Sequence, residues 1–296
     1  MWYTILQSGR HFPEALSGWP YYREEYRRNM GYGVQIFGCL RDFRKDPAGF
    51  FARLAQAGYQ QVEPCVLFGD ASGYPAALRE LVWKPQEVPA FQEMMEGQGL
   101  CLRSCHVLSR DVLGAAEEMA EFAQKTSIDA YVVNCPPDIA KVYRDFARDC
   151  RALAEKLAES GTALWLHNNA PEIAARVQGE AGETTVMEAI LQEAGEGLGA
   201  QVDTGWVLYG GIDPAAFLKR LGSRLRSVHF KDMAENCQSL SGLDRFAVLG
   251  SGVTDIPSVM AQIPEGMPVL VDQDATRGDF LEDLSASIQA LQAVRP

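Results

Sequence analysis

The sequence predicts an α/β protein with one domain, a (β/α)8 TIM barrel preceded by an N-terminal extension. From Gly33 onward, short apolar runs alternate with longer amphipathic segments, and a helical pattern follows each run. Eight such units fit within the 296 residues, which matches a TIM barrel, whose buried parallel strands are short and apolar. A doubly wound open sheet is the alternative fold, because periodicity does not report whether a sheet closes.

Capping residues and apolar runs in the sequence indicate where the helices and strands of this repeat begin and end. The segment 46–58 begins with Asp46 as N-cap and Pro47 in the first turn, and it ends at Gly58. The segment 213–222 repeats this start and stop, and the segment 138–161 has apolar residues at spacings of three and four. The expected strands are VQIF, QVEPC, LRSCHV, YVVN, ALWLH, AQVD, RSVHF and PVLVD, which begin at Val34, Gln61, Leu102, Tyr131, Ala163, Ala200, Arg226 and Pro268.

Residues 1–32 precede the repeat, and residues 33–296 form the predicted barrel. The stretch GWPYYREEYRRNMGYG in the extension mixes tyrosines with charged residues, unlike a barrel strand. We expect either a helix packed over the bottom of the barrel or a functional arm. Such an arm would act as a lid or be exchanged between the subunits of a homo-oligomer.

The composition favours a small-molecule partner. A net charge of −12 repels the phosphates of nucleic acids and anionic membranes, so we expect neither as a partner. The seven cysteines are an odd number without a CxxC pair, which favours reduced thiols and the cytoplasm. We expect neither export nor membrane insertion, because the sequence has no basic leader with an apolar core and no run of about 20 apolar residues.

Polar side chains gather where the predicted strands end. The carboxyl ends of the strands carry the chemistry in TIM barrels. Three of the four histidines lie there together with carboxylates, and imidazole with carboxylate is a ligand set for one divalent ion such as Mn²⁺, Co²⁺, Zn²⁺ or Mg²⁺. The set of strand-end residues is Gln35, Glu63, His106, Asn134, His167, Asp203, His229 and Asp272.

Other chemistries lack their motifs in this sequence. It contains neither the GxSxG elbow of serine hydrolases nor the GxxxxGK[ST] loop of nucleotide-binding proteins. The glycine-rich stretch LGSGVTD, residues 249–255, could receive a phosphate or sugar oxygen on its backbone amides, or could be a plain loop.

Seven ordered motifs give the chain a family resemblance from about Gly33 to Leu291. They are GVQIF, GYQQVEP, LRSCHV, LHNNAPE, VDTGWVLYGGIDPAAFL, RLRSVHFKD and VLVDQDAT. With these motifs the chain resembles the sugar phosphate isomerase/epimerase group of xylose isomerase-like TIM barrels, which includes ketose 3-epimerases, inosose dehydratases and relatives of endonuclease IV. The resemblance implies one divalent metal ion, held by residues of the fifth to eighth strands that are usually Glu, Asp, His and Glu.

Carried over to this sequence, the resemblance implies Glu172, Asp203, His229 and Asp272 as the metal ligands. Asp203 of VDTGW and His229 of VHFKD match the second and third ligands, and Asp272 stands where the group has Glu. The fifth strand departs from the group, because HNNAPE has Asn169 where the group has a second histidine. His167 at the strand end would then be a base or a polar contact, and the roles of His167 and Glu172 can be exchanged.

The resemblance also implies a reaction. A metal-bound carbonyl and its neighbouring hydroxyl would lose a carbon-bound proton to form a stabilised enediolate, in a sugar or keto-sugar substrate. The catalytic groups would be His167 or Glu172 on one side and Asp272 on the other, and substrate-binding groups would be Gln35, Glu63, His106 and Lys231.

Return of the proton gives an epimerase or isomerase, and loss of a β-leaving group gives a dehydratase or lyase acting on keto sugars or inososes. A binding subunit that has lost catalysis is a further alternative. A nuclease of the endonuclease IV kind is disfavoured by the acidic charge.

Overall fold

The structure, a computed structural model, describes residues 31–126, 128–179 and 182–295. The predicted extension, residues 1–32, lies outside the described residues except for Gly31 and Tyr32. The Tyr32 hydroxyl donates a hydrogen bond to the Leu291 carbonyl, at 3.2 Å, which ties the start of the barrel to its last helix.

The parallel sheet closes on itself through a divided second strand. β2 (Gln61–Glu63) pairs with β1 (Gly33–Gln35), and β3 (Cys65–Leu67) pairs with β4 (Ser104–Leu108). Pro64, which lacks an N–H, separates the two halves. The remaining barrel strands are β5 (Ala130–Asn134), β6 (Ala163–His167), β9 (Leu198–Asp203), β10 (Leu225–Phe230) and β13 (Val269–Asp272).

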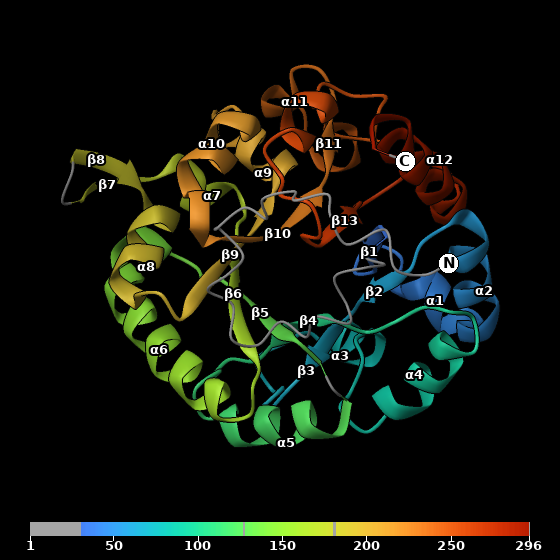
Figure 1. The fold of residues 1–296 in the computed structure, drawn as a ribbon, viewed down its shortest axis with the longest axis horizontal. Helices are drawn as coiled ribbons and strands as arrows, with labels where there is room; N and C mark the ends of the chain where they lie inside the picture. Colours follow the sequence, from blue (N-terminus) through green and yellow to red (C-terminus); the bar gives the residue numbers. More distant parts are fainter. Residues whose placement is uncertain (1–30, 127, 180–181, 296) are drawn as a thin grey trace, which may run out of the picture.

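The strand order β2-β1-β13-β10-β9-β6-β5-β4-β3 runs round the barrel and returns to its starting strand (Figure 1). All the predicted strands are present, and the predicted single-domain TIM barrel is confirmed. The helices form a ring outside the strands (Figure 1). They are α1 (Leu40–Lys45), α2 (Pro47–Ala57), α3 (Ala76–Leu81), α4 (Val88–Glu96), α5 (Ala116–Thr126), α6 (Ile139–Glu159), α7 (Ala170–Ala174), α8 (Val186–Ala194), α9 (Thr204–Tyr209), α10 (Pro214–Leu221), α11 (Ile256–Met260) and α12 (Phe280–Val294).

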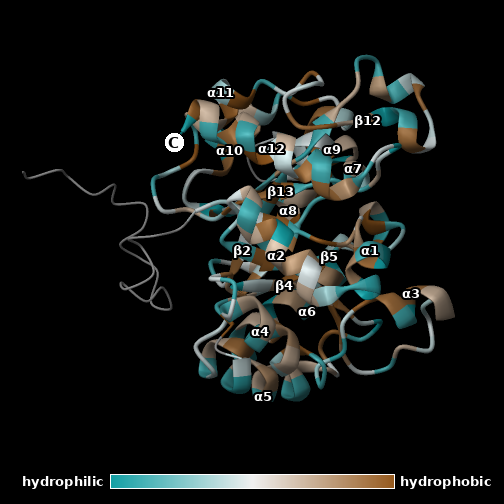
Figure 2. Ribbon diagram, turned by 90° about the vertical axis from the view of Figure 1, so that its right-hand side faces the viewer, coloured by the Kyte–Doolittle hydropathy of each residue, from teal (hydrophilic) through white to brown (hydrophobic). Residues whose placement is uncertain are grey.

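The predicted helix ends are those of the structure. Asp46 Oδ1 accepts from the Gly49 amide at 3.0 Å, and Gly58 ends α2 with a φ of 105°, in the left-handed region that favours glycine. The outer helices carry both apolar and polar residues, as α2 and α4 show in Figure 2, so that one face packs on the sheet and the other meets solvent.

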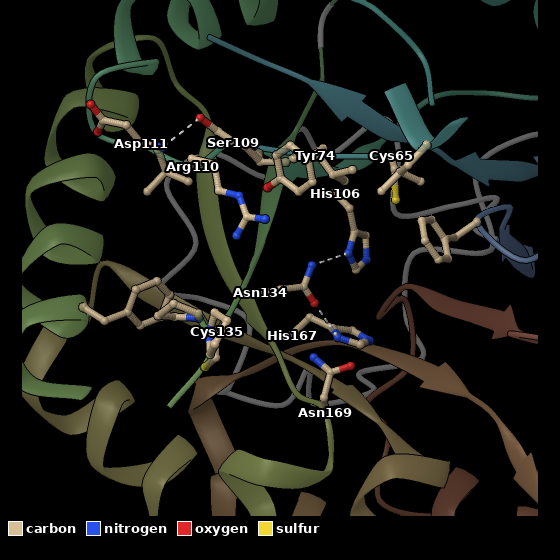
Figure 3. Close-up of a pocket in the computed structure, with 18 of the residues that line it drawn as sticks. Cys65, Tyr74, His106, Ser109, Arg110, Asp111, Asn134, Cys135, His167 and Asn169 are labelled. Carbon is tan, nitrogen blue, oxygen red and sulfur yellow. Dashed lines mark hydrogen bonds between the residues drawn. The ribbon is translucent and has the colours of Figure 1, made fainter. Parts of the chain in front are cut away.

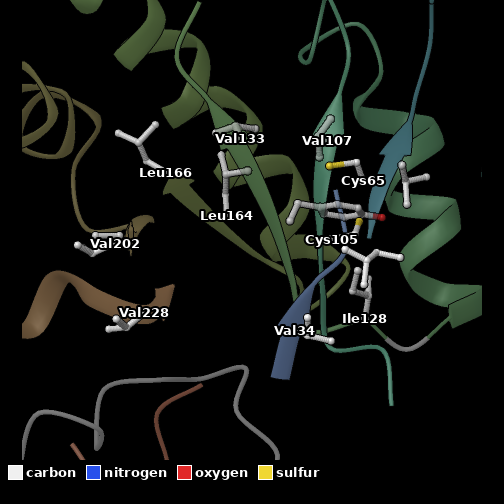
Figure 4. Packing of buried hydrophobic residues seen from close by; sticks show 14 of the residues in the cluster. Val34, Cys65, Cys105, Val107, Ile128, Val133, Leu164, Leu166, Val202 and Val228 are labelled. Carbon is white, nitrogen blue, oxygen red and sulfur yellow. The ribbon is translucent and has the colours of Figure 1, made fainter. Parts of the chain in front are cut away.

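Side chains alternate between the two sides of each barrel strand. Val107, Val202 and Val228 belong to the apolar core (Figure 4). Their chain neighbours His106 and His229 lie on the other side of the sheet, where they join polar groups inside the barrel. The interior near the carboxyl ends of the strands is therefore polar, whereas the layer between strands and helices is apolar.

Two small antiparallel hairpins lie in the segments that follow β6 and β10. β7 (Arg176–Gly179) pairs with β8 (Gly182–Thr185), and β11 (Asp232–Met233) pairs with β12 (Phe246–Ala247). The seven cysteines, all in described parts of the chain, are free thiols. Within those parts, no helix is long and apolar enough to cross a membrane.

Candidate functional site

A pocket of about 770 Å³ opens at the carboxyl ends of the barrel strands. Figure 3 shows His106, Asn134, His167 and Asn169 together, with Arg110 pointing toward them, and these four polar residues form the floor of the pocket. Part of the remaining lining is aromatic or aliphatic, namely Phe37, Tyr74, Val142, Phe146 and Trp206, and several carboxylates complete it. The pocket thus combines a polar floor with partly apolar sides, as sites for small molecules commonly do.

Four buried side chains from neighbouring strands converge beside this floor. His167 ends β6, Asp203 ends β9, His229 lies on β10, and Asp272 ends β13. One donor atom from each lies within 4.8 Å of the donor atoms of the other three. Three of the four residues predicted to bind metal, Asp203, His229 and Asp272, are therefore brought together.

The donor atoms of this group fit a divalent cation. His167 Nε2 and Asp272 Oδ1 are buried and have no hydrogen-bond partner among the described residues. Buried polar atoms without a partner are costly, and a metal ion would satisfy them. Two imidazoles with two carboxylates form a set for a borderline cation such as Zn²⁺, Co²⁺ or Mn²⁺. The cluster could therefore hold a metal ion.

His229 is held between two carboxylates. Its Nε2–H donates to Glu63 Oε2 at 2.7 Å, and its Nδ1 lies 3.2 Å from Asp272 Oδ2. Burial disfavours a charged ring, but Glu63 and Asp272 raise the pKa of His229 to about 10. A proton on Nδ1 therefore bridges His229 and Asp272, and it would have to leave if this nitrogen bound a metal ion.

Glu63, which the sequence analysis predicts to bind substrate, is not among the residues that line the pocket. It is fully buried, and its carboxylate accepts hydrogen bonds from Ser104 Oγ, from Gln201 Nε2 at 2.9 Å and from both His106 and His229. Burial alone would raise the pKa of Glu63, but His229 and His106 lower it well below its usual range. Glu63 orients the histidines above it, as carboxylates behind metal-binding histidines do.

Lys231 neutralises the carboxylates of the site. Its Nζ lies 2.8 Å from Asp203 Oδ2, 3.1 Å from Asp272 Oδ2 and 2.8 Å from Asp274 Oδ2. Burial opposes the ammonium charge, but these carboxylates raise the pKa of Lys231 well above its usual range. Lys231, which is predicted to bind substrate, lines the pocket, and its charge is already shared among three carboxylates.

Gly205 makes room for this lysine. A Cβ on Gly205 would lie 2.8 Å from Lys231 Cγ and 3.1 Å from the Lys231 carbonyl oxygen. Glycine in the DTGW motif therefore lets α9 pass directly over Lys231.

Asp274, two residues beyond Asp272, has the more open carboxylate of the two. Its side chain is 27% exposed and lines the pocket. Burial raises its pKa to about 6, against the opposing charge of Lys231.

The structure places His167, and not Glu172, in the group of candidate ligands. Glu172 Oε1 accepts a hydrogen bond from the Asn169 amide at 2.6 Å, at the start of α7. In return, the Asn169 side chain faces the backbone amide of Glu172, so that the two residues form a capping box at the start of the helix. Asn168 anchors the strand end instead, because its Oδ1 accepts from the Asp203 amide at 2.9 Å. The motif HNNAPE thus supplies one candidate ligand, one strand anchor and one helix cap.

The remaining substrate-binding predictions fall on the pocket surface. Gln35 and His106 both line it. Gln35 Oε1 accepts from the Phe37 amide at 2.5 Å, and its Nε2 lies 3.5 Å from Cys65 Sγ. Trp206 also lines the pocket, with its ring 5.2 Å from Lys231 Nζ.

Ser104 and Gln201 were missed by the sequence analysis, although a signal was available. Each lies two residues before a strand-end residue, His106 and Asp203 respectively, and alternation therefore turns both into the barrel. Asn134 stood in the strand-end set without a role, and it bridges His106 and His167.

The LGSGVTD loop does not offer its amides to a ligand. Asp232 Oδ2 accepts from the amides of Gly250 and Gly252, both at 2.9 Å, and Asp232 Oδ1 accepts from the Thr254 amide at 2.9 Å. The loop is folded round a buried side chain of this chain, which explains its glycines.

Comparison with solved structures gives the same fold. A sugar phosphate isomerase/epimerase from Parabacteroides distasonis is 18% identical and aligns over 89% of this chain and 94% of its own, with a TM-score of 0.65. The probable 3-DHS dehydratase of petrobactin synthesis from Bacillus anthracis is 12% identical, over 89% and 99%, with a TM-score of 0.63. A D-psicose 3-epimerase from Clostridium cellulolyticum is 12% identical, over 90% and 98%, with a TM-score of 0.58.

No curated protein sequence matches the chain significantly. The family model described as "xylose isomerase-like TIM barrel" matches residues 51–267, most of the chain and all but the first and last strands of the barrel. The chain therefore belongs to the xylose isomerase-like TIM barrel family.

Proposed function

We propose that the chain is a divalent-metal-dependent sugar isomerase or epimerase. The observation that carries this proposal is the convergence of His167, Asp203, His229 and Asp272 beside the floor of an open pocket, with His167 Nε2 and Asp272 Oδ1 buried and unsatisfied in the described chain. These four residues would hold one ion of Mn²⁺, Co²⁺, Zn²⁺ or Mg²⁺.

The charge of the site supports a divalent cation. Glu63, Asp203, Asp272 and Asp274 supply four carboxylates, against the cationic Lys231 and a protonated His229. This excess of negative charge in a buried place favours uptake of a cation. Replacing the His229 proton and sharing the carboxylates with a metal ion would balance it.

The bound ion would polarise a carbonyl and its neighbouring hydroxyl, and so acidify the carbon-bound proton between them. Asp274 is the group of this chain best placed to take that proton, because its partly exposed carboxylate has a pKa raised to about 6. Lys231, 2.8 Å from Asp274, is placed to return a proton or to bind a substrate oxygen. Trp206 would pack against the sugar ring.

The test is proton exchange in D₂O. Ketoses, 3-keto sugars and inososes would each be incubated with the metal-loaded protein and followed by NMR. We expect deuterium to enter the carbon next to the carbonyl of at least one substrate, and we expect Asp274→Asn to bind metal yet exchange far more slowly. The product spectrum separates an epimer or isomer from a dehydrated product. Absence of exchange in the whole panel with metal bound would contradict the proposal.

A further inference from the structure

Asn134 joins two histidine rings at the floor of the pocket. Its Nδ2 lies 3.3 Å from His106 Nδ1, and its Oδ1 lies 3.1 Å from His167 Nδ1 (Figure 3). The three residues stand on the adjacent strands β4, β5 and β6. We infer that Asn134 is a positioning residue that fixes the tautomers of both rings, so that the Nε2 lone pair of His167 faces the candidate metal ligands.

Glu63, at the buried end of this chain of hydrogen bonds, determines which atom donates in each of them. Glu63 as a carboxylate can only accept, so His106 Nε2, 3.1 Å from Glu63 Oε2, carries the proton. Gln201 Oε1 also accepts from this nitrogen, at 3.0 Å. In a neutral ring His106 Nδ1 is then an acceptor, and it receives the amide N–H of Asn134.

The side-chain amide of Asn134 then determines which nitrogen of His167 carries the proton. With its nitrogen turned to His106, Asn134 presents its oxygen to His167, and His167 Nδ1 must donate to it. In a neutral ring with its proton on Nδ1, the other nitrogen, Nε2, carries the lone pair. That nitrogen is buried, lies 3.7 Å from Asp203 Oδ2, and lacks a hydrogen-bond partner in the described residues.

A flipped amide would give the opposite result. If Asn134 turned its oxygen to His106, that ring would need protons on both nitrogens, and the amide N–H would meet His167 Nδ1. His167 would then carry its proton on Nε2 and could not bind a cation. An asparagine in the observed orientation therefore selects the ligand form of His167 and leaves His106 neutral. An aspartate would also draw a proton onto His106 Nδ1, and an aliphatic side chain would select no tautomer of either ring.

This inference deepens the proposed function and rests on it only in taking the His167 Nε2 lone pair as a metal ligand. The tautomers themselves are measurable in metal-free protein, whether or not a metal ever binds. Failure of the inference and failure of the proposed function can therefore be told apart.

The experiment is nitrogen NMR of the protein labelled with ¹⁵N-histidine, in the presence of a chelator and at neutral pH. The chain has four histidines, and single His→Gln variants assign the signals. We expect His167 to carry its proton on Nδ1 and His106 on Nε2. A proton on His167 Nε2 in the wild-type protein would overturn the inference.

Variants at position 134 provide the second readout. Asn134→Leu replaces the amide with an apolar side chain of similar size and so removes both hydrogen bonds. We expect His167 to become a mixture of tautomers and the affinity for Co²⁺ to fall about 10- to 100-fold. Asn134→Asp supplies acceptors to both rings, and we expect a proton to appear on His106 Nδ1. The Asp variant also serves if the Leu variant fails to fold.

Asn169→Leu is the matched control. Asn169 also lines the pocket, but its backbone bonds to Glu172 at a helix start, and no hydrogen bond links it to either ring in the described structure. We expect it to lower stability without changing the tautomers. Unchanged tautomers in Asn134→Leu, or an equal change in Asn169→Leu, would refute the role of Asn134.

Discussion

Glu63 holds His229 from beneath the pocket, with His229 Nε2 2.7 Å from Glu63 Oε2. The opposite nitrogen of the ring faces Asp272 Oδ2, at 3.2 Å. Glu63, which the sequence analysis predicts to bind substrate, thus turns the His229 ring so that Nδ1 faces Asp272.

Glu63→Gln should weaken metal binding while leaving all four candidate ligands in place. The substituted side chain would lack the charge that stabilises His229 and would present an amide N–H to one of the four donors that now bond to Glu63. We expect affinity for Zn²⁺ or Co²⁺ to fall about 10- to 100-fold by calorimetry. Unchanged metal affinity in a folded Glu63→Gln variant would show that His229 binds metal without the hydrogen bond to a Glu63 carboxylate.

The two candidates of the fifth strand can be separated by a pair of variants. His167→Gln should lose most of the metal affinity, because His167 Nε2 is the unsatisfied donor from β6. Glu172→Gln should keep it and lose only the contribution of a helix cap, about 0.5–2 kcal/mol in urea unfolding. The reverse pattern of metal affinities would return Glu172 to the ligand set.

Lys231→Met should make the metal-free protein unstable and more dependent on metal. Removing the ammonium leaves three carboxylates uncompensated, and breaking a buried ion pair in this way costs about 3–5 kcal/mol. Divalent ions should restore more stability to this variant than to the wild type, since the competing cation is gone. Thermal unfolding with and without Mn²⁺ measures this, and an equal effect of Mn²⁺ on both proteins would contradict it.

His167 should make the metal-free protein less stable in acid. Its pKa is lowered from 6.5 to about 4, so between these values the unfolded chain binds a proton that the folded protein does not. Stability should therefore fall as the pH drops from about 6.5 to about 4, by up to roughly 3 kcal/mol, and this contribution should not change further below that. Urea unfolding with a chelator would show a shallower fall for His167→Gln, and identical pH profiles would refute the assignment.

The barrel could be predicted in detail because its signals are local. Apolar runs such as ALWLH and helix ends such as Asp46 and Gly58 depend on a few neighbouring residues. The group of Asp203, His229 and Asp272 followed from the rule that the carboxyl ends of strands meet at one end of a barrel.

The roles within the site were harder to predict, because they depend on contacts across the barrel. Glu63 and His229 are far apart in sequence, and only the closed sheet shows that one supports the other. Glu172 had a local signal that competed with the metal assignment, since Asn169 with Glu172 three residues later is a capping pattern. Where such a cap accounts for a carboxylate, its use as a ligand needs separate support.

Metal stoichiometry tests the central claim most directly. Protein stripped with chelator would be incubated with Mn²⁺, Co²⁺, Zn²⁺ or Mg²⁺, desalted and analysed for metal, beside Asp203→Asn. This variant keeps an acceptor for the Trp206 amide, now 2.9 Å from Asp203 Oδ1, so that α9 stays capped while the charge is lost. We predict one ion per chain in the wild type and none in a folded Asp203→Asn. A wild-type protein that retains none of these ions, or an Asp203→Asn variant that binds them equally well, would contradict it.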